Sequence, residues 1–290
     1  MRKPQKLLSI FLPMLILTQL VEINVSAGEK YKLEYKANKN DGFQINAVRV
    51  HRNQRNIMGN EIITVSTDQY EYGFNALSSG EEGVHFEVEY LERIHETDDT
   101  QYLQGPDFSE LIGKKVTFVL SSTGEASKFE GFAELPAVMI ADEQRELNEH
   151  LYIIDLRELF PGLPEEEVAI GDSWTVLREY EEPVGESHLT VKIEFLYTVM
   201  GKDKIGSYDC LVMDGTYNVL VTGNPSLGGV DLIVKLEGEG TESFTFAPEL
   251  GMFLHSSGKL AMDGTAENEE VGLTLLFKHD YETEITVMFE

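Results

Sequence analysis

The stretch that decides the fold reads Leu189-Thr190-Val191-Lys192-Ile193-Glu194-Phe195-Leu196-Tyr197. Large apolar residues occupy every second position, and mostly polar residues stand between them. Successive side chains of a strand point to opposite faces, so this pattern would bury one face and leave the other in water. Antiparallel sheets commonly have one buried and one solvated face. The stretch therefore predicts a half-buried strand of an antiparallel sheet.

The same alternation recurs along the chain at Val84–Tyr90 and Tyr281–Phe289. Shorter predicted strands are Tyr31–Ala37, Phe43–Val50, Ile62–Ser66, Val116–Leu120, Trp174–Tyr180, Cys210–Leu220, Val230–Glu237 and Val271–Phe277. Turn dipeptides such as Asp41-Gly42 separate strands, because glycine accepts the positive φ of tight turns. About a dozen strands at this spacing are typical of sandwiches and barrels. The fold class is therefore predicted to be mainly β and antiparallel.

One segment follows a helical period instead. Between Asp142 and Phe160, Leu147, Leu151 and Ile154 recur at helical spacing, and Pro161-Gly162 ends the pattern. We interpret residues 141–168 as a helix and linker between two half-barrel or sandwich-like units, 28–140 and 169–290. Met213–Thr216 recurs as Met262–Thr265, which either a tandem duplication or convergence of strand–turn–strand units would explain.

The first residues, 1–27, have the order of a secretory signal peptide. Arg2, Lys3 and Lys6 precede an apolar run, Leu7–Leu20, and the small residues Val25-Ser26-Ala27 follow. This order predicts cleavage after Ala27 and an extracytoplasmic protein, either periplasmic or secreted. We expect no stable membrane insertion after cleavage, because no later segment is long and apolar enough to span a bilayer.

The charge of the chain limits its partners. It has 51 Asp and Glu residues against 23 Lys and Arg, a formal net charge of −28. So negative a protein repels nucleic acid, which we therefore exclude as a partner, and anionic membrane surfaces. The acidic runs at Glu96–Asp99 and Glu165–Glu167 are interpreted as solvated loops, with weak calcium binding left open.

The motifs of common enzyme classes are missing or incomplete. The seven histidines have no zinc-protease spacing, and no acidic loop matches the calcium-binding EF-hand pattern. Ser256–Lys259 fits a Ser-x-x-Lys string but lacks its companion elements. Cys210 and Trp174 are interpreted as core residues. We therefore predict no catalytic, cofactor-binding or metal-ligating residue and no cofactor, and the ligand-binding residues stay unidentified.

Three short motifs support a resemblance: Ile170–Thr175 opening a strand, Phe246–Gly251 in a turn, and Val116–Leu120 in a hairpin. They resemble an uncharacterised family of exported bacterial β-rich proteins. The sheets of that family are similar in style to the curved half-barrels of Lol-type lipoprotein carriers. The resemblance implies a curved antiparallel sheet with a helix across it, and no established activity. This chain departs from many exported relatives in lacking a lipidation cysteine at the cleavage point.

Three functions remain as hypotheses. A carrier of apolar or lipid-like small molecules would use a concave sheet face, although most such faces simply pack as a filled core. The residues predicted on that face are Phe86, Tyr90, Val191, Phe195 and Tyr197. A structural or interaction module would bind another envelope protein through an exposed patch or strand edge. A hydrolase would place a histidine or a carboxylate pair within hydrogen-bond reach of a nucleophile or water, and a polar pocket with His85, His188 or His255 beside clustered carboxylates would support it. The binding hypotheses are favoured, because every catalytic motif failed. An outer-membrane barrel is the competing architecture, and the helix and short early strands argue against it.

Overall fold

A computed structural model describes residues 29–57, 60–99, 105–140, 145–184, 187–227, 230–268, 270 and 272–289. The predicted leader and its cleavage site lie outside the described residues. Within this part of the chain, eleven strands form one antiparallel sheet in the order β5-β4-β3-β2-β1-β15-β14-β13-β10-β9-β8. The prediction of a mainly β, antiparallel chain is confirmed.

The bounds of the elements are as follows. The large sheet contains β1 (Gly42–Ile57), β2 (Asn60–Gly80), β3 (Gly83–Thr97), β4 (Lys115–Leu120), β5 (Ala126–Glu130), β8 (Ser173–Val184), β9 (Ser187–Ile205), β10 (Tyr208–Gly223), β13 (Ile233–Ala247), β14 (Met252–Asn268) and β15 (Leu273–Phe289). Two small sheets pair β6 (Val138–Ile140) with β7 (Arg145–Leu147) and β11 (Ser226–Leu227) with β12 (Val230–Asp231). The helical elements are the 3₁₀ turn η1 (Phe132–Glu134) and the helix α1 (Glu149–Arg157).

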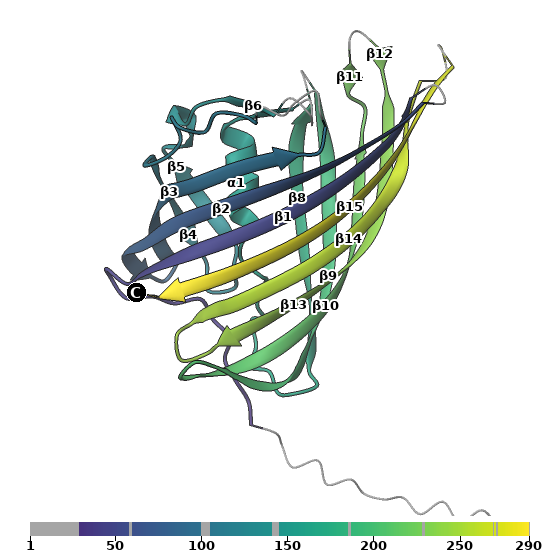
Figure 1. The fold of residues 1–290 in the computed structure, drawn as a ribbon. Coiled ribbons are helices and arrows are strands. Elements are labelled where there is room, and N and C mark those ends of the chain that lie inside the picture. The colour runs from purple at the N-terminus through teal and green to yellow at the C-terminus, as the bar shows by residue number, and fades with distance from the viewer. Residues whose placement is uncertain are drawn as a thin grey trace, which may run out of the picture.

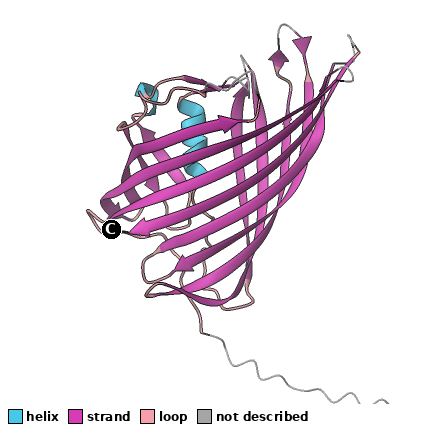
Figure 2. Ribbon diagram, in the orientation of Figure 1, coloured by secondary structure: helices cyan, strands magenta, loops and turns pink. Residues whose placement is uncertain are grey.

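The sheet is strongly curved and remains open, with β5 and β8 as its two edges (Figure 1). The helix α1 lies on the concave side (Figure 2), which is the arrangement that the resemblance implies. Antiparallel pairing of β1 with β15 joins the strands before the helix to those after it. The two predicted units thus contribute to a single sheet, and their domain boundaries stay a prediction.

The helix α1 is shorter than the predicted Asp142–Phe160. Residues Arg145–Leu147 pair as a strand with Val138–Ile140, so the helix begins only after them. Asn148 caps it, its side chain accepting a hydrogen bond from the backbone N–H of His150 at 3.1 Å. The buried side chains Leu151, Tyr152, Ile154 and Leu156 then attach the helix to the sheet interior.

Aromatic rings fill one end of the concave side. The Phe43 and Phe74 rings stack at 4.9 Å between centroids, and Phe160, from the segment after α1, meets Phe74 edge-on at 5.9 Å. Phe86, Tyr90 and Tyr197 belong to the same core and are almost completely buried. At this end the concave face is therefore a filled core.

Two sequence expectations need correction. The segment Tyr31–Ala37 is not a strand and makes a single β-bridge, between Tyr31 and Val168. Trp174 packs against the core near the start of β8, but it is only half-buried, because β8 is an edge strand with a neighbour on one side. Its ring packs against Tyr197, and its Nε1–H donates to the carbonyl of Gly162 at 3.1 Å. Cys210 is buried, as predicted.

Candidate functional site

Beyond the filled core, the concave side of the sheet holds a cavity of about 480 Å³. The inward positions of β1 show the transition along one strand: Phe43, Ile45 and Ala47 belong to the core, and Arg49 and His51 line the cavity. Strands β8, β9, β10, β13, β14 and β15 supply most of the remaining wall. The helix α1 contributes Leu151, Ile154 and Asp155, and Glu158 follows directly after it.

Strand register arranges the wall in rows that cross the sheet. One row runs His51, Tyr281, Leu260, Gly240, Tyr217, Phe195, and the next runs Asn53, His279, Met262, Gly238, Val219, Ile193. Both rows begin with polar or hydrogen-bonding side chains on β1 and β15 and end with large apolar or aromatic ones on β10 and β9. The cavity wall is therefore polar at β1 and β15 and apolar at β10 and β9. It becomes polar again at β8, where Arg178, Tyr180 and Glu182 line the cavity.

Gly240 in β13 makes room for the aromatic ring of Tyr217. A Cβ atom at Gly240 would lie 2.2 Å from the ring of Tyr217 and 2.6 Å from the carbonyl oxygen of Lys259. The tyrosine ring therefore occupies space that a side chain on β13 would take. Its hydroxyl donates to that carbonyl of Lys259, on β14, at 3.0 Å, which holds the ring in place.

A buried charge cluster lies where the cavity meets α1. Asp155 of the helix accepts from Arg49 at 2.7 Å and from Arg93 at 3.1 Å. The side chains of Arg49 and Arg93 are only 6% and 1% exposed, so Asp155 compensates two charges removed from water. The Arg93 guanidinium also lies over the Tyr70 ring, 4.4 Å from its centroid. These contacts fix the helix against β1 and β3.

A second buried carboxylate, Asp68, extends the cluster behind the cavity wall. Its Oδ1 lies 3.1 Å from Nδ1 of His95, and its Oδ2 lies 3.6 Å from Nε2 of His51. Burial by itself would raise the pKa of Asp68. The hydrogen bond with His95 and the charges of Arg93, His95 and His51 outweigh it and lower that pKa to about 2. Asp68 therefore stays ionised across the physiological range.

Two further carboxylates of the cavity, Glu158 and Glu242, are held by hydroxyl donors. Glu158 accepts from the hydroxyl of Tyr180 at 2.9 Å. Glu242 accepts from Tyr197 at 2.5 Å and from Ser256 at 3.0 Å. Both carboxylates are thus held in place by side chains of the protein.

The predicted concave face divides between the core and the cavity. All five residues belong to the core; Val191 and Phe195 also line the cavity, whereas Phe86, Tyr90 and Tyr197 do not. None of the three histidines named for the hydrolase hypothesis, His85, His188 and His255, lines the cavity, whereas His51 and His279 do. His188 and His255 lie at the surface beside Glu181 and Glu284, 3.4 Å and 3.5 Å away.

The sequence analysis missed the charge cluster, although the sequence holds a signal for part of it. Arg49 continues the inward alternation of Phe43, Ile45 and Ala47. Asp68 likewise continues the alternation of Tyr70 and the apolar residues after it. Charged residues at apolar positions of a strand indicate a buried ion pair or a site. Arg93 and His95 carry no such signal, because a bulge at Leu91 shifts their alternation relative to Tyr90.

Comparisons with known proteins give no family for this chain. No protein-family model and no curated protein matches it. Among solved structures, Pseudomonas aeruginosa OccK2 (OpdF) is 7% identical, with a TM-score of 0.24, covering 86% of this chain and 98% of that one. A DUF1329 family protein from Desulfovibrio piger is 8% identical, with a TM-score of 0.16, covering 84% of this chain and 85% of that one. Scores this low describe a weak structural resemblance, and we base no functional argument on them.

The described residues contain no helix long and apolar enough to cross a membrane.

Proposed function

We propose that this chain is an exported binding protein whose cavity holds an amphipathic, lipid-like molecule. The observation that carries the proposal is the change across the cavity wall from polar side chains on β1 and β15 to an apolar stretch on β9, β10 and β14. The apolar part of the ligand would lie on β9, β10, β13 and β14, against Val219, Ile193 and Leu260. Its polar end would face β1 and β15, near Arg49 and His51.

The dimensions of the cavity support this proposal. Small-molecule sites typically have volumes of roughly 300–1,000 Å³, with mostly apolar walls and a few placed polar groups. The cavity of about 480 Å³ lies in that range. The predicted leader, residues 1–27, agrees with an exported protein.

A binding assay with a dansyl-labelled fatty acid tests the proposal. The protein is unfolded in denaturant, washed free of ligand and refolded, and the probe is titrated while its fluorescence is recorded. We expect saturable binding by the wild-type protein. Native mass spectrometry before the wash should show a bound small molecule that the wash removes.

The variant Val219→Phe locates the bound probe. Val219 lines the cavity on β10, so a phenylalanine there takes up space that the acyl chain would occupy. We expect the dissociation constant to rise about tenfold, equivalent to about 1.4 kcal/mol. Leu196→Phe is the matched control, because Leu196 is 50% exposed and points away from the cavity. Absence of binding by the wild-type protein, or equal binding by both variants, would contradict the proposal.

A further inference from the structure

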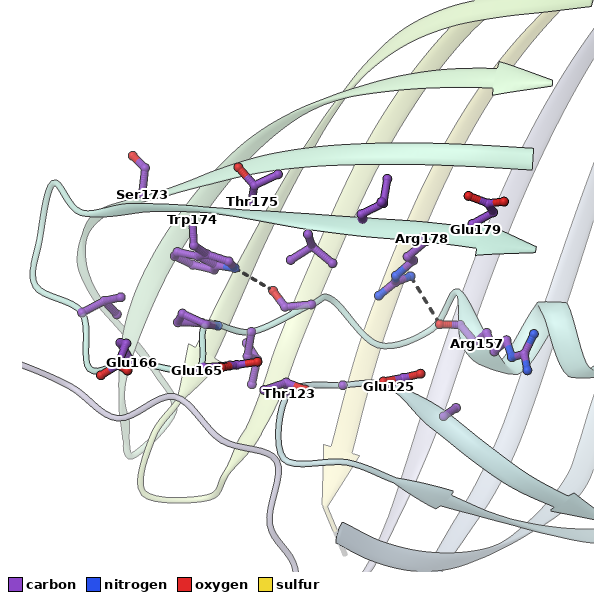
Figure 3. Close-up of a pocket in the computed structure, with 18 of the residues that line it drawn as sticks. Thr123, Glu125, Arg157, Glu165, Glu166, Ser173, Trp174, Thr175, Arg178 and Glu179 are labelled. Atoms are coloured by element: carbon purple, nitrogen blue, oxygen red, sulfur yellow. Dashed lines mark hydrogen bonds between the residues drawn. The ribbon is translucent and has the colours of Figure 1, made fainter. Parts of the chain in front are cut away.

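A second groove, of about 770 Å³, runs along the edge of β8 and shares Glu158, Arg178 and Tyr180 with the ligand cavity (Figure 3). One side is the continuous stretch from Ser173 to Tyr180, and the other sides are residues 162–168 and 123–126. The far side is fixed: the N–H of Leu163 donates to the carbonyl of Thr123 at 2.9 Å. Trp174 and Arg178 reach across to the carbonyls of Gly162 and Arg157 at 3.1 Å and 3.3 Å. Hydrogen bonds therefore hold both sides of this groove, which lies beside a strand edge.

The edge of β8 offers backbone groups that need partners. The N–H of Gly171 donates to the carbonyl of Val199 at 2.8 Å, and the N–H of Val199 donates to the carbonyl of Asp172 at 3.0 Å. From Trp174 onwards, the backbone N–H and C=O groups of every second residue of β8 form the hydrogen bonds to β9. The N–H and C=O groups of Thr175, Leu177 and Glu179 consequently point away from β9. In the described part of the chain, no strand pairs with this edge.

We infer that this edge of β8 is a docking site where a basic, extended segment of a partner protein adds to the sheet as a further strand. Such addition is an established mode of recognition, in which backbone hydrogen bonds supply affinity and side-chain contacts supply specificity. The inference does not depend on the cavity holding a ligand.

The charge around the groove selects the partner. The carboxylates that line it are Glu125, Glu158, Glu165, Glu166, Glu167, Asp172 and Glu179, against the basic residues Arg157 and Arg178. Both guanidinium groups are already engaged, Arg178 with backbone carbonyls and Arg157 over the ring of Phe129 at 5.0 Å. A lysine- or arginine-bearing strand would meet these carboxylates favourably. A second copy of this chain would place acidic edges against each other.

An apolar contact beside the edge supports the same mode. Leu177 is 67% exposed on the outer face of β8, and Leu196 on the neighbouring strand β9 is 50% exposed. The register Thr175↔Leu196 and Leu177↔Glu194 makes the two leucines diagonal neighbours. An apolar side chain on the incoming strand would cover Leu177.

The test uses a synthetic peptide of alternating lysine and valine, about eight residues long to match Ser173–Tyr180. Trp174, the single tryptophan of the chain, lines the groove and reports binding by its fluorescence. We expect saturable binding that weakens with salt and protects the amides of Thr175, Leu177 and Glu179 from hydrogen exchange. A peptide with glutamate in place of lysine should not bind.

Two changes remove the backbone contacts specifically. Leu177→Pro deletes one edge N–H, a substitution that edge strands tolerate, and should weaken peptide binding about tenfold. Leu177→Ala, which keeps the N–H, is the matched control and should lose less. A peptide N-methylated at alternate residues tests the same bonds without altering the protein. Equal binding of the methylated peptide, or unchanged exchange at the β8 amides, would overturn the inference, as would dimerisation through this edge in analytical ultracentrifugation.

Discussion

Asp155 connects the helix to the sheet through two arginines that come from distant parts of the chain. Arg49 precedes it by 106 residues and Arg93 by 62. Both guanidinium groups are almost fully buried, and Asp155 itself is 14% exposed. An ion pair in such surroundings is sensitive to loss of one partner, because the remaining charge stays buried without compensation.

We therefore predict that Asp155→Asn lowers the free energy of unfolding by about 3–5 kcal/mol. The asparagine keeps the shape of the side chain and removes its charge. Urea denaturation followed by circular dichroism measures the change. Glu179→Gln is a suitable control, because Glu179 forms an exposed ion pair with Lys192 at 3.0 Å. This substitution should lower the free energy of unfolding by less than about 1 kcal/mol. Similar losses in the two variants would show that the buried cluster contributes little.

At the scale of elements, the inner face of β13 is shaped by small residues. Gly238 and Gly240 leave the width that the opposing side chains of β10 and β14 need. The ring of Tyr217 lies in the space beside Gly240 and forms part of the cavity wall.

We predict that Gly240→Ala destabilises the protein by about 1–3 kcal/mol, because the new methyl group would overlap both a ring and a backbone oxygen. The displaced Tyr217 ring should also weaken binding of the dansyl-labelled fatty acid. Gly201→Ala is the control in β9, where a Cβ would meet nothing within 4 Å. Thermal unfolding of both variants decides the matter: a Gly240→Ala protein as stable as Gly201→Ala would contradict the described packing.

At the scale of the whole molecule, the buried carboxylate Asp68 gives folding a dependence on acid. Its pKa in the folded protein is about 2, below the ordinary 3.8. A lowered folded pKa stabilises the protein above the unfolded value, and this contribution is lost as the pH falls towards the folded value. The loss should thus occur between about pH 4 and pH 2 and amount to about 2 kcal/mol.

The variant Asp68→Asn tests this contribution. We expect it to be less stable than the wild-type protein at neutral pH and to lose less stability between about pH 4 and pH 2. Asp209→Asn is the control, because the side chain of Asp209 is 93% exposed. Unfolding free energies from urea titrations at each pH give the comparison. Parallel pH profiles for the wild-type protein and Asp68→Asn would show that Asp68 does not cause the pH dependence of stability.

Much of the local structure could be predicted from the sequence, because alternation is a local property. Leu189–Tyr197 shows which residues of a strand share a face, and the structure places Val191, Phe195 and Tyr197 on the concave side together. The helix was predicted too long, since the pairing of Arg145–Leu147 with Val138–Ile140 is a tertiary contact that helical spacing cannot reveal.

The sequence by itself determined that the chain is mainly β, antiparallel and highly acidic, with one helix between two groups of strands. Only the tertiary structure decided that β1 pairs with β15, and hence where the cavity lies and which edge remains open. It also decided that Arg49, Arg93, Asp68 and Asp155 meet. The physical reason is that a strand's alternation records which face is buried, whereas its choice of neighbour depends on packing between segments far apart in the chain.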